Sequence, residues 1–356
     1  MANTGRDSQD KGDESRDAHP GIMTLLASRR VRVVVVTTSW PRNDEDFVGR
    51  FVADAVERLR ARGVEVQVVA RGLDGGVAAT VRRRPWAAVP LLVSLVRATR
   101  RAARGADLVH AHWLLTAAVA RFAGKPFVVT LHGSGTAGRF SDVELARRYP
   151  RFVRALLRRA RAVICVSETV ASAMRAAGVA NVVVVPNGVA IPDAPGAPAE
   201  PPEVLYLGRL SPEKNIDTLV EAVGDLNLVV AGDGPLRTLV PHALGAVSHE
   251  EAGRLLERAS VLVAPCEREG FGLAAAEAMA YGRPVVAAAG GGLLELVDDE
   301  TGILVEPRNA PAMRTAVRTL LADPALCARL GAAGRERARE RFGWDTVIDK
   351  TLEAYR

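Results

Sequence analysis

Long apolar runs are missing from this chain. No stretch of 18 consecutive apolar residues occurs among its 356 residues, whereas a helix that spans a bilayer needs about 20. Residues 1–28 are polar and charged and lack the apolar centre of a signal peptide, so we expect a disordered tail there. These absences predict a protein that works in the cytoplasm.

Cysteine and aromatic residues are also scarce. Cys165, Cys266 and Cys327 are isolated from one another, which excludes a disulfide framework and a cysteine-based zinc site and indicates a reducing compartment. Aromatic residues make up only 4% of the chain. Because no recognition motif or interleaved aromatic platform is present, we expect no nucleic-acid partner.

The remaining composition is that of a globular protein, with 48% hydrophobic and 25% charged residues in a length suited to two domains. The charge is unevenly divided between the halves. Residues 1–190 contain 30 basic and 16 acidic residues, a net charge of +14. Residues 191–356 contain 17 basic and 25 acidic residues, a net charge of −8.

Basic and apolar residues are interleaved in two segments of the first half, 82–104 and 147–161. Only four of the 47 basic residues are lysines, so arginine supplies both clusters. Helices of this kind can lie on an anionic membrane surface, which would place the protein peripherally at the inner face of the cell membrane. Solvated helix faces in an arginine-rich chain are the alternative, and the sequence leaves both open.

Strand and helix patterns alternate along the first half, which predicts a doubly wound α/β domain. The β-branched run at 31–38 is typical of a buried parallel strand. Further strands are expected at 64–70, 108–111, 127–131, 162–166 and 182–185, and helices at 47–62, 142–161 and 168–177.

Five prolines between residues 190 and 203 predict a semi-rigid linker and the clearest domain boundary. Alternation then resumes. Strands are expected at 204–207, 228–231, 261–264 and 285–288, and helices at 215–223, 250–258, 273–281, about 309–322, 325–341 and 344–355. The predicted organisation is a tail at 1–28, domains at 29–189 and 204–342 joined by the linker at 190–203, and a crossover helix at 343–356.

The most informative stretch runs from Glu269 to Met279. It follows the apolar run 261–265 and reads as a strand, a glycine-bearing turn and the start of a helix. Such a turn directs free backbone N–H groups and the positive end of the helix at one place, which suits a phosphate. Glu269 lies before the helix and Glu277 about one turn inside it. A nucleotide sugar, with hydroxyl groups at both ends and two phosphates between them, fits this layout.

Other motifs stand in a consistent order around that stretch. They are Val109-His110-Ala111-His112-Trp113, Val129-Thr130-Leu131-His132-Gly133-Ser134, Val185-Pro186-Asn187-Gly188-Val189, Leu207-Gly208-Arg209-Leu210-Ser211-Pro212-Glu213-Lys214-Asn215 and Ala231-Gly232-Asp233-Gly234-Pro235. Together they resemble the retaining glycosyltransferases of family 4 over residues 31–345. The alternative for the glutamates alone is a solvated helix face.

The resemblance implies a GT-B fold, in which two Rossmann-like domains face a central cleft and a C-terminal helix crosses back to the first domain. It implies that Arg209 and Lys214 contact the donor diphosphate and stabilise the leaving nucleoside diphosphate. Glu277 would accept from the ribose hydroxyls and Glu269 from hydroxyls of the transferred sugar. The backbone N–H groups of Gly270, Phe271 and Gly272 would touch the sugar, and those of Leu273 and Ala274 the phosphate.

In the first domain, the resemblance places His132 near the reactive centre of the sugar. Gly49 matches the glycine of a flexible loop near the phosphates and the acceptor, although the frequent glycine pair of that loop is replaced here by Asp46-Phe47-Val48-Gly49-Arg50. His110 and His112 end a strand that faces the same cleft, and either a direct or a structural role fits them. Asn187-Gly188 is expected to be a structural turn.

The resemblance also implies transfer of a hexose-type sugar from a UDP- or GDP-sugar with retention of configuration. No cofactor or metal is expected, because Asp44-Glu45-Asp46 lies in the wrong context for a metal site. The acceptor would be a lipid-linked sugar or a small metabolite. The region between Ala222 and Ser248 is shorter than in the family, which leaves the nucleotide base undetermined. A UDP-sugar 2-epimerase on the same fold and a non-catalytic sugar-nucleotide-binding subunit remain alternatives.

Overall fold

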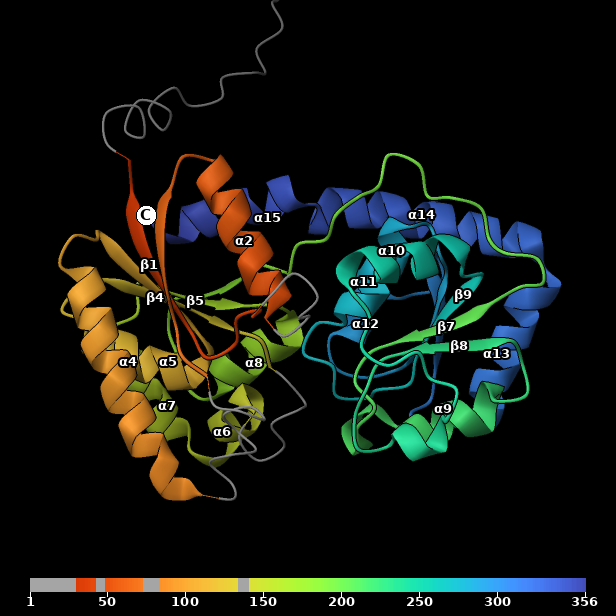
Figure 1. The fold of residues 1–356 in the computed structure, drawn as a ribbon, viewed down its shortest axis with the longest axis horizontal. Coiled ribbons are helices and arrows are strands. Elements are labelled where there is room, and N and C mark those ends of the chain that lie inside the picture. Colours follow the sequence, from red (N-terminus) through yellow and green to blue (C-terminus); the bar gives the residue numbers. More distant parts are fainter. Residues whose placement is uncertain (1–29, 43–48, 73–83, 134–140) are drawn as a thin grey trace, which may run out of the picture.

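A computed structural model describes residues 30–42, 49–72, 84–133 and 141–356. The chain forms two parallel sheets, each packed between helices, that lie side by side (Figure 1). The first sheet has the order β2-β1-β3-β4-β5-β6. Its strands are β1 (Arg32–Thr37), β2 (Glu65–Ala70), β3 (Leu108–His112), β4 (Phe127–Leu131), β5 (Ala162–Cys165) and β6 (Val182–Val184).

The central strands of this sheet are buried on both faces, which explains their unbroken apolar sequences. One face packs on α4 (Ala88–Ala103), α5 (Trp113–Arg121), α7 (Pro150–Leu157) and α8 (Glu168–Ala176). The other face packs on α2 (Arg50–Ala61) and α15 (Trp344–Ala354). Alternate residues of β1 divide between the two cores: Val34 and Val36 face α4, whereas Val33 and Val35 face α2.

The second sheet has the order β11-β10-β9-β7-β8. Its strands are β7 (Val204–Leu207), β8 (Leu228–Ala231), β9 (Val261–Ala264), β10 (Val285–Ala288) and β11 (Gly302–Val305). Its helices are α9 (Ile216–Val223), α10 (His249–Arg258), α11 (Leu273–Ala280), α12 (Leu293–Leu296), α13 (Ala310–Ala322) and α14 (Pro324–Phe342). Between β8 and α10 the described chain contains only the short 3₁₀ turn η4 (Arg237–Leu239).

The structure corrects the expected helix at 142–161. Two helices occupy this segment, α6 (Asp142–Arg148) and α7, and they meet at Tyr149, whose φ of −131° is not helical. Pro150 begins α7, where its missing N–H group is tolerated, but it could not continue α6. The structure also contains α5, α12 and β11, which the sequence patterns did not predict.

The C-terminal helix joins the two domains. α14 runs along the second domain, and α15 continues from it to the first domain (Figure 1). There Val347 and Ile348 are buried against α2 and the first sheet, and Asp349 pairs with Arg62 at the end of α2. The prediction of an α/β fold with two Rossmann-like domains and a C-terminal helix that crosses back is therefore confirmed.

The proline-rich segment 190–203 lies along the second domain. Arg283, only 5% exposed, donates to the carbonyl oxygens of Pro195 (2.7 Å) and Gly196 (3.0 Å). Arg335 of α14 donates to the carbonyl oxygens of Pro192 and Asp193. These hydrogen bonds from two arginines attach the segment to the second domain.

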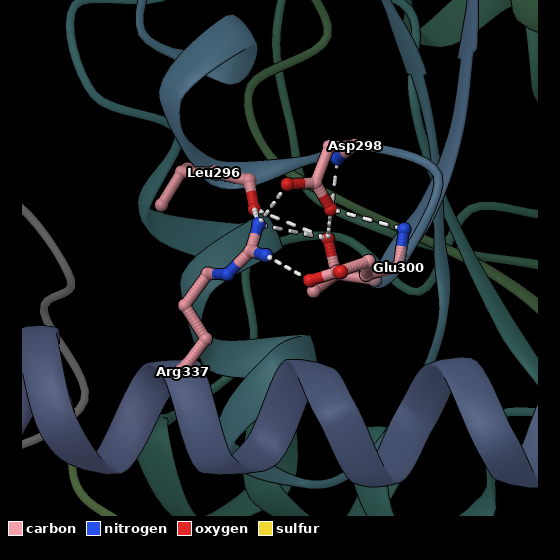
Figure 2. A network of polar contacts seen from close by, with 5 residues as sticks. Leu296, Asp298, Glu300 and Arg337 are labelled. Carbon is pink, nitrogen blue, oxygen red and sulfur yellow. Dashed lines mark hydrogen bonds and ion pairs between the residues drawn. The ribbon is translucent and has the colours of Figure 1, made fainter.

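A polar network fastens α14 to the turn that follows α12 (Figure 2). Arg337 of α14 donates to Asp298 Oδ2 at 2.7 Å, to Glu300 Oε2 at 3.3 Å and to the carbonyl oxygen of Leu296 at 3.3 Å. Arg337 is only 17% exposed, so these contacts are partly shielded from water. They fix the end of α12, the helix that packs beside the start of α11.

Within the described ranges, no helix combines the length and apolar character needed to cross a bilayer.

Candidate active site

The turn between β9 and α11 is held in place by glycine-mediated packing. Gly272 precedes α11 with a φ of 98°, a left-handed conformation that favours glycine. Beneath the turn, Gly290, Gly291 and Gly292 contact its backbone so closely that a Cβ on any of them would overlap it. The N–H of Gly292 donates to the carbonyl oxygen of Glu269 at 2.8 Å. The glycine triplet after β10 was a sequence signal for this site that we did not use.

Lys214 and Glu269 meet at the carboxyl edge of the second sheet. Lys214 ends the 3₁₀ turn η3 (Pro212–Lys214) after β7, and Glu269 follows β9. Because β7 and β9 are neighbours, their carboxyl ends deliver both side chains to one place. Lys214 Nζ forms an ion pair with Glu269 Oε1. The two side chains are 18% and 22% exposed and line a pocket with Tyr206, Gly208, Cys266, Gly272 and Ala274.

The ion pair keeps Lys214 charged. Burial is the largest single effect and would lower its pKa, but Glu269, Cys266 and Glu213 together outweigh it, so the pKa of Lys214 lies above its ordinary value. A partly buried ammonium group is therefore available at neutral pH. It can attract an anionic ligand group at the edge of the pocket.

Glu277 projects from α11 in a region where the two domains approach. Burial, with a smaller effect from the charge of Asp54 on α2, raises the pKa of Glu277 to about 7. Asp54 itself accepts a hydrogen bond of 2.9 Å from Arg50 in the first turn of α2. The Glu277 carboxyl group is thus protonated in part near neutral pH and can accept or donate hydrogen bonds.

Two other predicted residues lie at the rim of this region. Arg209 follows β7 with an exposed side chain, and its carbonyl oxygen accepts a 2.8 Å hydrogen bond from Tyr206. Gly49 immediately precedes α2 with a φ of 76°, and a Cβ there would overlap the backbone of Ser39. Asp44, Glu45 and Asp46 lie outside the described residues.

His132 belongs to a stack of three histidine rings at the carboxyl edge of the first sheet. His132 Nε2 lies 3.0 Å from His112 Nδ1, and their ring centroids are 5.3 Å apart. His110 stacks on His112 at 4.6 Å. The rings of Phe51 and Trp113 each lie 4.9 Å from that of His132. Trp113 has a φ of 71°, a strained backbone conformation of the kind that clusters at functional sites.

All three imidazoles are held neutral. Burial lowers the pKa of His132 to about 3 and that of His110 to about 4, and it holds the pKa of His112 well below its ordinary value. A neutral ring donates from one nitrogen and accepts with the other. His132 Nδ1 is buried and forms no hydrogen bond of normal geometry among the described residues, although the Asn187 side chain is near enough to raise the pKa of His132 against the larger effect of burial. His132 can therefore offer a hydrogen bond to a ligand, but not a positive charge.

His110 has a structural anchor that we did not predict. Its Nδ1 lies 2.8 Å from the hydroxyl of Tyr355, and its Nε2 lies 2.7 Å from Thr130 Oγ1. Tyr355 closes α15, so the crossover helix contacts the histidine stack directly. This contact joins residues 245 positions apart, a separation that no local sequence pattern reveals.

Asp142 holds the first half of the site in place, and Ser167 connects it to the second half. Asp142 accepts from the N–H groups of Leu114 (3.1 Å) and His132 (3.2 Å), and burial raises its pKa to about 6. The Ser167 hydroxyl donates to the carbonyl oxygen of Gly270 at 2.6 Å. Gly270 lies so close to His132 that a Cβ would overlap the His132 carbonyl oxygen. The sequence analysis gave neither Asp142 nor Ser167 a role in the site, although Asp142 begins α6 and Ser167 precedes α8.

The neutral rings of the first domain and the charged groups of the second domain meet where Gly270 contacts His132. We call this contact between the domains the seam. A molecule that carries both negative charge and hydroxyl groups can be held on such a seam, with its charge on the second domain. Fold and site together define an α/β protein with two Rossmann-like domains and a ligand site at the carboxyl edges of both sheets.

Comparisons with known proteins specify the family. The family model "Glycosyl transferases group 1" matches residues 190–337, and the model "Glycosyltransferase Family 4" matches residues 48–191. The chain is 33% identical over 283 residues to glycogen synthase of Mycobacterium tuberculosis, covering 70% of this chain and 68% of that protein. It is 39% identical over 181 residues to D-inositol 3-phosphate glycosyltransferase of Xylanimonas cellulosilytica, covering 45% and 43%.

Solved structures agree. Sucrose-phosphate synthase from Thermosynechococcus elongatus superposes with a TM-score of 0.75 at 25% identity, covering 92% of this chain and 98% of that one. Anabaena HepE in complex with UDP and glucose has the same fold, with a TM-score of 0.70 at 19% identity and coverage of 92% and 99%. This chain belongs to the glycosyltransferases of the GT-B fold. The predictions of the fold class and of a glycosyltransferase are thereby confirmed.

Proposed function

We propose that this glycosyltransferase moves a hexose-type sugar from a UDP- or GDP-sugar to an acceptor with retention of anomeric configuration and without a metal ion. The observation that carries the proposal is the Lys214–Glu269 ion pair at the start of α11, with Glu277 further along the same helix. A sugar nucleotide has a diphosphate between two hydroxyl-bearing rings. The site offers a cation paired with one carboxyl group, and a second carboxyl group lies further along the same helix.

The donor diphosphate would lie between Lys214 and the N-terminus of α11. Lys214 supplies a point charge and Arg209 a planar fork for phosphate oxygens. The free N–H groups of Leu273 and Ala274 add hydrogen bonds at the helix start. Glu277 would accept from the ribose hydroxyls, and Gly49 would allow the backbone before α2 to approach the phosphates. HepE, a protein of the same fold, is described in complex with UDP and glucose, which supports a uridine donor.

The transferred sugar would lie over the seam at Gly270. Glu269 would accept from its hydroxyls, and the backbone N–H groups of Gly270, Phe271 and Gly272 would contact it. His132 lies on the opposite side, as a neutral group suited to hydrogen bonding. As the glycosidic bond breaks, charge develops on the leaving diphosphate, and Lys214 and Arg209 would stabilise it. The departing phosphate would accept the acceptor's proton on the same face of the sugar, so no enzyme nucleophile is required.

The acceptor would bind to the first domain. Sucrose-phosphate synthase and D-inositol 3-phosphate glycosyltransferase bear names that indicate small phosphorylated acceptors. A small hydroxylated metabolite is one acceptor class that fits such relatives, and a lipid-linked sugar is the other. Acceptor loops vary on a shared fold.

The test is a panel of UDP- and GDP-sugars, each incubated with small-molecule and lipid acceptors while nucleotide release and product anomers are measured. Glu269→Gln should keep nucleotide binding and lose most transfer, because Glu269 is placed on the sugar. Glu250→Gln, an exposed change on α10, is the matched control. Equal loss of nucleotide binding in Glu269→Gln would contradict the assignment. Isomerised donor without transfer would indicate the epimerase, and binding without turnover the non-catalytic subunit.

A further inference from the structure

One helical layer of the first domain exposes large apolar side chains. Trp86 in the 3₁₀ turn η1 (Pro85–Ala87) is 68% exposed, Val89 on α4 is 64% exposed and Phe152 on α7 is 63% exposed. Val93, Phe122 and Tyr149 are also exposed. In the part of the chain that the structure describes, every exposed aromatic side chain belongs to this layer. An aromatic-poor protein thus concentrates its water-exposed aromatics in one region.

These side chains come from neighbouring elements of one helical layer. α4 packs against α5, and α5 packs against α7, and all three lie on the same side of the first sheet (Figure 1). No residue within α5 is exposed, so α4 and α7 supply the outer surface, together with Phe122 after α5. Arg100 of α4 donates to the carbonyl oxygen of Phe122 at 2.8 Å, which links the end of α5 to α4. Trp86, Val89 and Val93 recur at helical spacing. The opposite side of α4 is anchored in the core.

Three helices of this layer carry positive charge without negative charge. The helices α4, α5 and α7 contain no aspartate or glutamate. None of the exposed arginines of α4 and α7 forms an ion pair within residues 84–133 and 141–356. Those arginines are Arg97, Arg100, Arg101, Arg151 and Arg154, with Arg104 and Arg158 capping the two helices.

We propose that the outer face of α4 and α7, together with Phe122 after α5, docks on the surface of an anionic lipid bilayer. Binding is stabilised when tryptophan and phenylalanine side chains enter the headgroup region. Each arginine near the surface contributes roughly 1 kcal/mol through attraction to anionic lipids. A nucleic acid would satisfy the arginines, but it would leave Val89 and Val93 in water. A bilayer satisfies both kinds of side chain.

Docking in this way would place the candidate site near the membrane. α4 follows β2, so the start of α4, next to Trp86, lies at the carboxyl side of the first sheet. His112 and His132 lie on the same side. An acceptor held in the membrane would then lie close to the seam between the domains. The docking proposal itself does not depend on the proposed function.

The experiment is co-sedimentation of the full chain, without sugar nucleotide, with vesicles of phosphatidylcholine or of equimolar phosphatidylcholine and phosphatidylglycerol. Binding is expected only with phosphatidylglycerol, and it should weaken as salt rises, because exposed charges are screened over about 10 Å at 0.1 M. Replacing Arg97, Arg101 and Arg151 by Gln should weaken binding about 100-fold, at roughly 1 kcal/mol for each arginine. Trp86→Ser with Phe152→Ser should also release the protein.

Matched controls test the location of the surface. Replacing Arg254, Arg318 and Arg329 of the second domain by Gln removes the same charge, and Leu239→Ser with Leu244→Ser removes exposed apolar side chains there. Both control variants should bind vesicles as the parent does. Equal losses in patch and control variants, or absence of sedimentation at low salt, would overturn the proposal.

A second arm tests a nucleic-acid partner. Single-stranded DNA that binds at the same ionic strength, with an affinity insensitive to Trp86→Ser and Phe152→Ser, would replace the bilayer as the partner and overturn the proposal. Sugar-nucleotide binding is measured on each preparation as a check of folding. A failure to bind vesicles therefore remains distinguishable from a failure of the donor-site assignment.

Discussion

The two domains contribute opposite chemistry to the same seam. The first presents three buried imidazoles whose pKa values are lowered by burial, so its contribution is neutral. The second presents Lys214 and Glu269, which remain partly exposed and charged. The difference follows from what each group must do: a charge that engages a phosphate has to remain accessible, whereas a ring that orients a sugar gains rigidity from burial. Single substitutions can test whether the second domain contributes charge and the first domain contributes rigid neutral rings.

The largest effect on turnover is expected from Gly270→Ala, because this substitution alters the contact between the two domains. The new Cβ would overlap the carbonyl oxygen of His132. Separating the domains locally should lower turnover by about 100-fold, since a displacement of about 1 Å at a reacting centre can cost that much. Steady-state kinetics measure the effect. Gly105→Ala is the control, because the atom nearest its Cβ would lie 3.9 Å away. Unchanged turnover in Gly270→Ala would contradict a site at this seam.

Lys214→Ala should come next, because it removes charge from the second domain alone. Loss of a charge-assisted contact is expected to weaken donor binding and lower the rate together, on the order of 1–3 kcal/mol. Calorimetry with the nucleoside diphosphate and kinetics with the donor measure the two quantities. Lys350→Ala, an exposed change on α15, should have no effect. Activity of Lys214→Ala within twofold of the parent would remove Lys214 from the donor site.

The pH dependence of donor binding should isolate Glu277. Its pKa is raised to about 7 in the folded protein, so the carboxyl group is neutral below that pH and ionised above it. An ionised carboxylate accepts hydrogen bonds from ribose more strongly, and donor affinity should therefore rise several-fold as pH increases through 7. Sugar nucleotides are suitable probes because their diphosphate does not titrate there. Glu277→Gln should bind with a flat profile, and a variant with the parent's profile would refute the role of Glu277.

The same shift predicts the direction of a stability effect. A carboxyl group whose folded pKa is raised binds more protons folded than unfolded between the ordinary pKa of glutamate and about 7. Its contribution to stability is complete at low pH and is lost as pH rises through 7. Urea unfolding of the parent and of Glu277→Gln at two pH values measures this difference, and the variant should gain relative stability above pH 7.

The smallest effect is expected from Tyr355→Phe, which disturbs the first domain without touching the seam. The change removes the hydroxyl that lies 2.8 Å from His110 Nδ1 and leaves a buried ring nitrogen without that partner. A loss of about 1–3 kcal/mol in the free energy of unfolding is expected, with turnover changed far less than in Gly270→Ala. Tyr281→Phe, a partly exposed tyrosine, is the control for urea unfolding. A large loss of turnover without loss of stability would assign the histidine stack a direct chemical role.

Sequence patterns were sufficient to predict structure where neighbouring residues in the sequence determine it. The β-branched run of β1 and the glycine turn before α11 required no knowledge of distant partners. The meeting of Lys214 with Glu269, 55 residues apart, was accessible because both follow strands of one parallel sheet. The roles of these residues in catalysis remain predictions.

Sequence patterns failed to predict structure where it depends on packing between residues far apart in the sequence. The helix α5 begins at Trp113, whose left-handed backbone no propensity would suggest. The break between α6 and α7 required Pro150 to outweigh a continuous helical pattern. Tyr355 and Ser167 act on residues 245 and 103 positions away, and only the folded chain brings them together.

The route of the chain between the domains limits how they can move. It passes from one domain to the other twice, at Gly188-Val189 and at Gly343, and these two passages lie side by side, joined by the 2.9 Å hydrogen bond from Val189 N–H to the Phe342 carbonyl oxygen. Gly188 packs on the ring of Trp344, and the proline-rich segment that follows is bound by arginines. The two connections therefore meet at one place. We expect any separation of Gly270 from His132 to pivot at that place, because both connections between the domains pass through it.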